Sequence, residues 1–219
     1  MSKLSESVIM ENSKIPGHAV ILQHFETRDD RMAEVIRQYG PMKLVQNRKY
    51  FIVLCKAIIG QQISTQAAAT ITCRFFKLFD EQSPHPAAFD TLTERELRSV
   101  GLSRQKVAYL KDLSRHFLEK SVRPHRFRFM SNQEVVENLT AIYGIGQWTA
   151  EMFLIFSLNR PNVLPIQDLG FQAGVRKIYR MKKNPDAKKL RALGKKWQPL
   201  ETVATWYAWR IQDETVISY

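Results

Sequence analysis

Apolar residues recur along most of the chain at the three- and four-residue spacing of helices, and the two-residue alternation of strands is almost absent. Glycine, proline and small polar residues divide this pattern into short segments. The pattern predicts an all-α fold with helices at 15–25, 29–39, 50–59, 64–79, 93–100, 103–119, 132–142, 148–158, 169–179 and 199–212. Asp29, Ser64 and Ser131 stand where N-terminal caps are expected. The segment 50–59 is apolar nearly all round, which is typical of a central buried helix.

Composition narrows the class of protein. With 219 residues, 44% of them apolar, the chain can bury a real core. A net charge of +12 indicates a polyanionic partner such as nucleic acid, although a merely soluble basic protein would show the same charge. No apolar run reaches the about 18 residues of a membrane span, and we see no signal peptide. We therefore expect an intracellular protein, in the cytoplasm or nucleoid, or in the nucleus if the source is eukaryotic. We also expect a monomer.

The cysteines and histidines offer no metal chemistry. Cys55 and Cys73 are too few for a disulfide framework and are not spaced as a metal knuckle, so we expect both as reduced core residues. The five histidines show no ligand spacing either. The sequence therefore predicts no catalytic metal and no cofactor.

A short turn with two glycines lies between the predicted helices 132–142 and 148–158. It reads Tyr143-Gly144-Ile145-Gly146. Such a turn brings unpaired backbone N–H groups and the positive end of a helix dipole together, which suits a phosphate. Downstream, Asp168 follows Pro165 and precedes another helix, so we expect it to cap that helix as an ionised carboxylate.

Two later segments allow alternative interpretations. The run 182–196 is the densest cationic stretch of the chain, and it is either a solvated helix face or a phosphate contact. Trp197, Trp206 and Trp209 lie within thirteen residues, and aromatic residues near a C-terminus are usually core.

The hairpin and the aspartate together resemble the helix-hairpin-helix (HhH-GPD) superfamily of base-excision DNA glycosylases. The stretches 57–68 (AIIGQQISTQAA) and 197–210 (WQPLETVATWYAWR) resemble its 3-methyladenine DNA glycosylase II branch, and the likeness runs from about residue 50 to residue 210. The resemblance implies a single two-lobed glycosylase unit over 1–219, with a DNA-binding cleft between the lobes. We expect one lobe at 41–143 and the other at 13–40 plus 144–219.

The resemblance also implies an activity on double-stranded DNA that contains alkylated bases. Asp168 matches the catalytic aspartate, which would stabilise the oxocarbenium-like sugar while the N-glycosidic bond of a flipped alkylated purine is hydrolysed. Members that also cut the strand have a lysine where this chain has Trp148, so the reaction should stop at the abasic site. Alternatives are a glycosylase for another damaged or mismatched base, and an inactive protein that binds distorted DNA.

The remaining site residues follow from the same likeness. Trp148, Trp209 and Met152 are expected in the base pocket, with Met152 at a position where the family has tyrosine. Gln62 is expected to fill the gap left by the flipped nucleotide. The residues expected to contact DNA are Gln61, Gln62, Ser64, Gly144, Ile145, Gly146, Gln147 and Thr149. A monovalent cation, Na⁺ or K⁺, is expected against the hairpin carbonyls near Tyr143 and Gly146.

Overall fold

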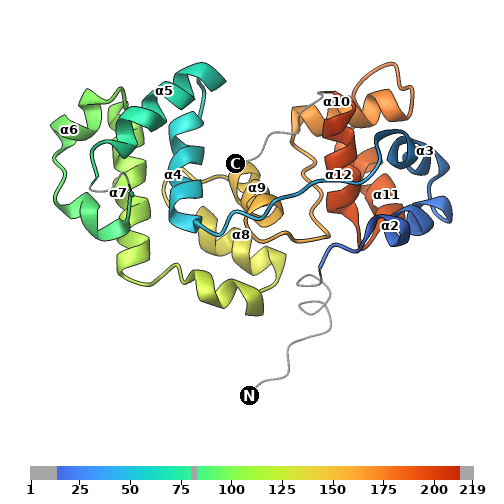
Figure 1. The fold of residues 1–219 in the computed structure, drawn as a ribbon, viewed down its shortest axis with the longest axis horizontal. Helices are drawn as coiled ribbons and strands as arrows, with labels where there is room; N and C mark the ends of the chain where they lie inside the picture. The colour runs from blue at the N-terminus through green and yellow to red at the C-terminus, as the bar shows by residue number, and fades with distance from the viewer. Residues whose placement is uncertain (1–13, 80–82, 213–219) are drawn as a thin grey trace. The chain divides into compact units, whose positions relative to one another are not determined.

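The computed structural model describes residues 14–79 and 83–212, which form helices joined by loops (Figure 1). No strand occurs within these ranges, so the all-α prediction is confirmed. The α-helices are α2 (His18–Glu26), α3 (Asp30–Tyr39), α4 (Tyr50–Gly60), α5 (Thr65–Phe76), α6 (Glu94–Ser99), α7 (Arg104–Leu118), α8 (Asn132–Thr140), α9 (Gln147–Phe156), α10 (Leu169–Ile178), α11 (Ala187–Trp197) and α12 (Glu201–Arg210). Among the described residues, the 3₁₀ helices η2 (Pro86–Asp90) and η3 (Pro124–Phe129) lie between α5 and α6 and between α7 and α8. In the described residues, no helix is both long enough and apolar enough to cross a membrane.

Side-chain caps determine where several helices begin. Asp29, Ser64 and Ser131 each accept a hydrogen bond from a backbone N–H in the first turn of the helix that follows, as predicted. The cationic run 182–196 becomes helical only from Ala187, because the carboxylate of Asp186 caps α11 by accepting from the Lys189 amide at 2.8 Å. Neither 3₁₀ helix was predicted, since each is too short to show a helical period.

The chain divides into two compact units. One consists of residues 47–153, and the other combines the segments before residue 47 and after residue 153. Residues 41–46 and 144–153 therefore lie in the opposite unit from the lobe expected for each, and the division falls inside α9 rather than at the hairpin turn. The hairpin belongs to 47–153 because it is hydrogen-bonded to α7 and to the loop after α4, as described below.

In the unit of 47–153, α4 contacts α5 and α7. Most of its residues are buried, as its apolar sequence predicted. Phe51 on α4 packs edge-on against Phe89 and Phe117, at ring-centroid distances of 5.7 and 5.2 Å. Cys55 is also buried, but Cys73 is exposed, so that prediction is wrong for Cys73. Its helix, α5, is alanine-rich and carries a single buried residue, Phe75, and half of its residues are exposed.

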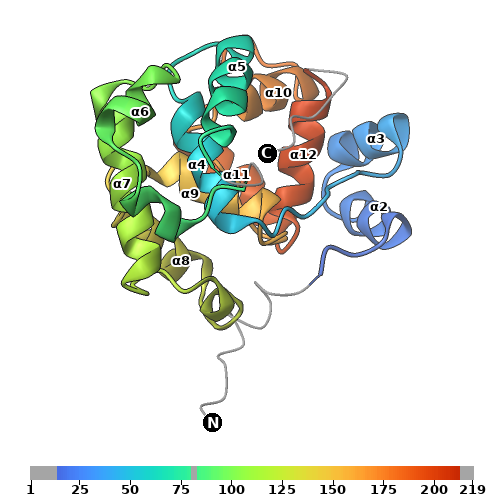
Figure 2. The same ribbon diagram turned by 60° about the vertical axis from the view of Figure 1, so that its left-hand side comes forward.

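The other unit is built around α10 and α12, which pack against each other. Gly174 on α10 permits this close approach, because a Cβ there would overlap the backbone of Ala208 on α12. Helices α2 and α3 lie side by side in both views (Figures 1 and 2), and α3 contacts α10 and α12. The buried carboxylate of Asp29 joins these elements by accepting from the Tyr179 hydroxyl and, at 3.0 Å, from Trp197 Nε1.

Candidate active site

The turn between α8 and α9 requires glycine at its centre. Gly144 has φ +88°, and a Cβ at this position would overlap the ring of Tyr109 on α7. The Tyr109 ring also meets the exposed Tyr143 ring edge-on, with 4.6 Å between the centroids. The turn is therefore shaped by α7 as well as by its own sequence.

Asp112, one turn further along α7, fixes the start of the turn. Its Oδ2 accepts a hydrogen bond from the Tyr143 amide at 2.8 Å. Partial burial raises the pKa of Asp112, but hydrogen bonds from Arg115 and the Tyr143 amide, with the charges of His116 and Arg115, outweigh burial and keep this pKa below its ordinary value. Asp112 is therefore kept as an ionised carboxylate, and its hydrogen bond attaches the start of the turn to α7.

The loop after α4 is bonded to the same turn. Gln61 donates from Nε2 to the Gly144 carbonyl at 2.8 Å, and Lys106 on α7 donates from Nζ to the Ile59 carbonyl at 2.7 Å. The neighbouring Gln62 is exposed and has φ +57°, a left-handed conformation that is uncommon for glutamine. The hydrogen bonds made by Gln61 and Lys106 thus fix the loop after α4, which carries the strained residue Gln62.

The N-terminus of α9 opens directly from the turn. Its first backbone bond runs from the Ala150 amide to the Gly146 carbonyl at 3.1 Å. In the described part of the chain, the amides of Gly146 and Gln147 find no acceptor. Because these N–H groups stand at the positive end of the helix dipole, the turn is suited to bind a phosphate.

The other hairpin residues differ in accessibility. Trp148 is 39% exposed, whereas Ile145, Thr149 and Met152 are buried, at 4%, 7% and 4% exposure. A side-chain contact with DNA is therefore open to Trp148 but not to Ile145 in this conformation. The hydroxyl of Ser64 caps α5 by accepting from the Ala67 amide at 3.2 Å.

Asp168 stands at the N-terminus of α10, where it caps the helix as predicted. Its Oδ1 accepts from the Phe171 amide at 2.6 Å and from Trp209 Nε1 at 2.8 Å. The carboxylate is only partly buried. Two N–H donors and a helix N-terminus thus surround one oxygen of a carboxylate that remains reachable from solvent, an arrangement that stabilises its negative charge.

Trp209 is itself held by aromatic stacking. Its ring lies nearly parallel to that of Phe156, with an interplanar angle of 13° and 5.6 Å between the centroids. Gly170 has no side chain to crowd Asp168 and Trp209. A Cβ at this position would lie 3.3 Å from Asp168 Oδ1 and 3.5 Å from the Trp209 ring. Phe156 therefore orients the indole of Trp209, and this indole in turn orients the carboxylate of Asp168.

Three supporting residues were not predicted from the sequence: Tyr109, Asp112 and Phe156. The first two lie within a predicted helix, and no local pattern marks them as partners of a turn some 30 residues away. Phe156 lies in the apolar run 148–158, where nothing separates it from the core residues around it.

Ligands for a metal ion could come from side chains or from the backbone carbonyls of the hairpin. No group of three or more His, Cys, Asp or Glu residues that could hold a metal ion occurs in residues 14–79 and 83–212. Of the hairpin carbonyls, that of Gly144 accepts from Gln61 and that of Gly146 from Ala150. The monovalent cation near Tyr143 and Gly146 stays a prediction.

Comparison with known proteins identifies relatives. Residues 55–199 match the HhH-GPD superfamily of base excision DNA repair proteins. The chain is similar to DNA-3-methyladenine glycosylase 1 of Schizosaccharomyces pombe, with 31% identity over 182 residues that cover 82% of this chain and 80% of the relative. It is also similar to a putative DNA-3-methyladenine glycosylase of Bacillus subtilis, with 29% identity over 87% of this chain and 68% of the relative.

Two solved structures share the fold. The DNA-3-methyladenine glycosidase of Bacillus halodurans superposes with a TM-score of 0.81 and 34% identity, covering 87% of this chain and 88% of that one. The 3-methyladenine DNA glycosylase of S. pombe, in complex with abasic DNA, gives a TM-score of 0.75 and 30% identity, covering 87% and 95%.

Proposed function

Because the chain belongs to the HhH-GPD superfamily of base excision DNA repair proteins, we propose that it is a monofunctional DNA glycosylase for alkylated purines. Its substrates would be bases of the 3-methyladenine and 7-methylguanine type in double-stranded DNA. The observation that carries the proposal is the Asp168 carboxylate, held at a helix N-terminus by the Phe171 amide and the Trp209 indole. The names of the relatives supply the class of lesion.

Asp168 acts on charge that develops during the reaction. As the bond between sugar and base breaks, the sugar becomes an oxocarbenium-like cation, and an ionised carboxylate beside it lowers the energy of that transition state. Water then adds to the sugar and leaves an abasic site. N-methylated purines of this type carry a positive charge, so they depart as neutral bases and need little proton donation.

Aromatic side chains would recognise the flipped base. The family assigns Trp148, Trp209 and Met152 to the pocket. An indole face attracts a cationic purine more strongly than ordinary stacking does, and the exposure of the Trp148 side chain supports this role. Met152 is flexible and polarizable, so its presence in place of tyrosine would alter selectivity among bases.

The chemistry should stop at the abasic site. A lyase forms a Schiff base between a lysine amine and the sugar. Two residues after Gly146, where the lyases of the family have that lysine, stands Trp148, and an indole is not a nucleophile. We assign no step to a metal ion or cofactor.

DNA would be held by the hairpin and opened by the loop after α4. The amides at the start of α9 would bind a backbone phosphate. The exposed Gln62 would occupy the space of the extruded nucleotide, and its left-handed backbone supports this, since strain of this kind is concentrated at functional sites. The side-chain amide of Gln61 is committed to the Gly144 carbonyl, which supports a role in holding the loop rather than in touching DNA.

The decisive experiment is base release from methylated duplex DNA by the wild type and by Asp168→Asn. Asparagine keeps the helix cap but loses the charge, so base release should fall by orders of magnitude while affinity for the duplex changes little. The matched control is Asp186→Asn, which makes the same change at the cap of α11 and should leave activity unchanged. Release at the wild-type rate by Asp168→Asn would refute the mechanism.

The same reaction separates the alternatives. Chromatography of the freed bases tells an alkylpurine glycosylase from one that acts on deaminated or mismatched bases. Strand breaks that appear only after alkali would support monofunctional chemistry, and breaks without alkali would contradict it. Salt-sensitive binding without base release would favour a catalytically inactive DNA-binding protein.

A further inference from the structure

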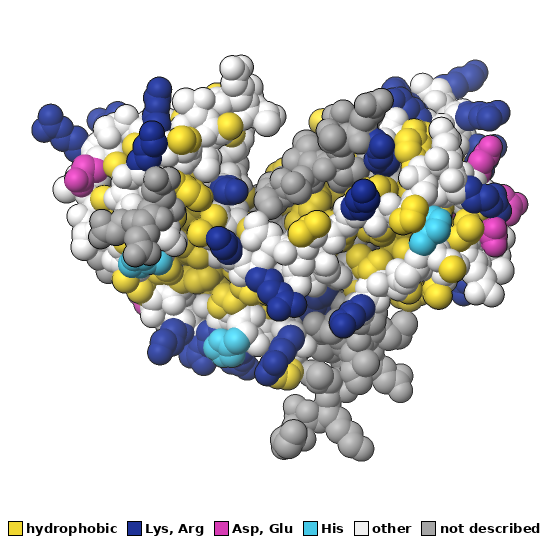
Figure 3. Space-filling model, in the orientation of Figure 1, with side chains coloured by type: hydrophobic (Ala, Val, Ile, Leu, Met, Phe, Trp, Pro, Cys, Tyr) yellow, Lys and Arg dark blue, Asp and Glu magenta, His cyan; other side chains and the backbone are white. Residues whose placement is uncertain are grey.

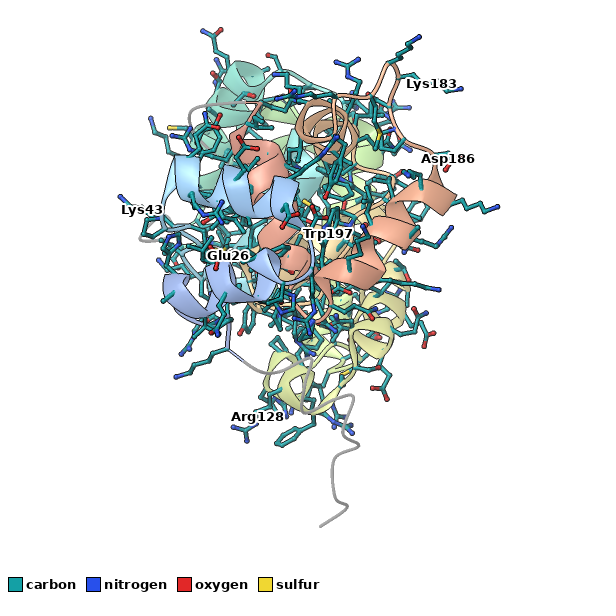
Figure 4. The ribbon with its side chains drawn as sticks, turned by 90° about the vertical axis from the view of Figure 1, so that its right-hand side faces the viewer. Glu26, Lys43, Arg128, Lys183, Asp186 and Trp197 are labelled. Carbon is teal, nitrogen blue, oxygen red and sulfur yellow. The ribbon has the colours of Figure 1, made fainter. Side chains whose placement is uncertain are left out.

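Helix α11 carries two opposite faces. One face is buried and consists of Leu190, Leu193, Gly194 and Trp197. The other is exposed and carries five cations: Lys188, Lys189, Arg191, Lys195 and Lys196. At 100° per residue these five fall within about 160° of the helix circumference. Figure 4 shows Trp197 among the helices of its unit, whereas Lys183, before the helix, lies at the outer edge.

On α11 itself these cations have no acidic neighbours. None of the five has an ion-pair partner among the residues that the structure describes. Asp186, the only acidic residue between 180 and 200, uses its carboxylate to cap the helix. Lys188 and Arg191 are three residues apart and Arg191 and Lys195 four apart, so like charges are neighbours and destabilise the helix. Across the face of both units seen in Figure 3, lysine and arginine are likewise more numerous than acids.

The cationic face continues onto the turn between α2 and α3. A hollow of about 660 Å³ there is lined by Lys189 and Lys196 together with Arg28 and Arg31. Its acidic residues are Glu26, Asp29 and Asp30.

Two of these three acids are already engaged. Glu26 forms an ion pair with Arg37 at 2.8 Å, and Asp29 accepts from Tyr179 and Trp197. Asp30 alone leaves its carboxylate unpaired in the described residues. With four cations against three acids, one of which is paired with Arg37, the hollow keeps a net positive charge.

This surface is separate from Asp168. The buried face of α11 points toward α10, where Trp197 meets Phe171 edge-on at 6.2 Å, one turn from Asp168. A Cβ at Gly194 would likewise overlap Leu164. The cations occupy the opposite side of a helix about 10 Å across, so a ligand on them does not touch the catalytic carboxylate.

We propose that the outer face of α11, with Arg28 and Arg31, is a second binding surface for the phosphodiester backbone of DNA. It would hold undamaged duplex beside or away from the lesion. Eleven residues of helix span about 16 Å, the length over which one strand of B-DNA presents about five phosphates at 3.4 Å each. The exposed face of α11 has no aromatic or large apolar side chain, so it lacks the anchors of a membrane-binding helix or a protein interface.

The test is the salt dependence of binding to an undamaged duplex of about 40 base pairs. In the variant Lys188→Gln/Arg191→Gln/Lys195→Gln, three phosphate contacts are lost, and the slope of log affinity against log salt should flatten by about 2.7. Between 50 and 200 mM salt, the wild type should then lose about 40-fold more affinity than the variant. All three side chains are exposed, so the fold should be unaffected.

The control is Arg95→Gln/Arg98→Gln/Lys111→Gln, which removes the same charge from exposed positions on α6 and α7. Equal flattening in both triple variants, or none in the α11 variant, would overturn the proposal. So would binding to vesicles of anionic lipid that depends on α11 when binding to duplex does not. Base release from a short methylated duplex reports on Asp168 separately, and it should be the same in the α11 variant as in the wild type.

Discussion

Replacing Trp209 by phenylalanine tests how Asp168 is held. The variant keeps an aromatic ring against Phe156 but removes the N–H group that donates to Asp168 Oδ1 at 2.8 Å. Oδ1 then loses the indole donor and keeps the bond from the Phe171 amide at 2.6 Å. If the indole bond orients the carboxylate toward the sugar, its loss should slow base release without preventing the substrate from binding.

The size of the effect follows from the bond. A hydrogen bond to a charged group contributes about 1.5–3 kcal/mol, and the lower value applies here because Asp168 is partly exposed and water can replace the donor. At about 1.4 kcal/mol per factor of ten, base release should slow about tenfold, with a ceiling of about 150-fold.

The assay is single-turnover base release from methylated duplex, paired with affinity for abasic duplex. Trp206→Phe is the matched control, because Trp206 lies on the same helix and is buried, yet its Nε1 finds no acceptor among the described residues. We expect Trp209→Phe to slow release relative to Trp206→Phe, with affinities within about threefold. Equal release rates in the two variants would refute a positioning role for the indole.

Two further predictions concern the hairpin and pH. Gly144→Ala should lower the free energy of unfolding by roughly 1–3 kcal/mol and weaken duplex binding, because φ is +88° and the Tyr109 ring fills the space of the added Cβ. Gly146→Ala is the control, since nothing lies within 4 Å of its added Cβ. Fluorescence-anisotropy titrations with duplex DNA should show weaker binding for Gly144→Ala and unchanged binding for Gly146→Ala. Burial raises the pKa of Glu201 in the folded state, so the folded protein holds its proton more tightly and loses stability as pH rises above the ordinary value of 4.5. Glu201→Gln should therefore raise the unfolding temperature at pH 7 but not at pH 4, and a pH-independent difference would contradict this.

The features predicted correctly from the sequence are those with local causes. Helical periodicity and capping both act within about four residues, so every described α-helix except α11 and the caps at Asp29, Ser64, Ser131 and Asp168 could be predicted. The 3₁₀ helices were missed because five or six residues are too few to show a periodic pattern.

The contacts that shape the site arise from long-range packing. The bond from Tyr143 to Asp112 joins residues 31 apart, the bond from Trp209 to Asp168 residues 41 apart, and the bond from Gln61 to Gly144 residues 83 apart. No local pattern specifies such pairs. The roles of Asp168 and Trp209 could be proposed only from the family resemblance, and their hydrogen bond not at all.

The hairpin shows why a glycine motif alone does not define a phosphate site. Glycines permit the turn, but they also make it flexible in isolation. Here the Asp112 carboxylate, the Tyr109 ring and the Gln61 amide each contact the turn at Tyr143 or Gly144. Because these contacts are made before any DNA arrives, the amides of α9 are already oriented, and a phosphate does not have to order them. The glycine turn therefore binds a phosphate well only where the surrounding fold supplies side chains that hold the turn in place.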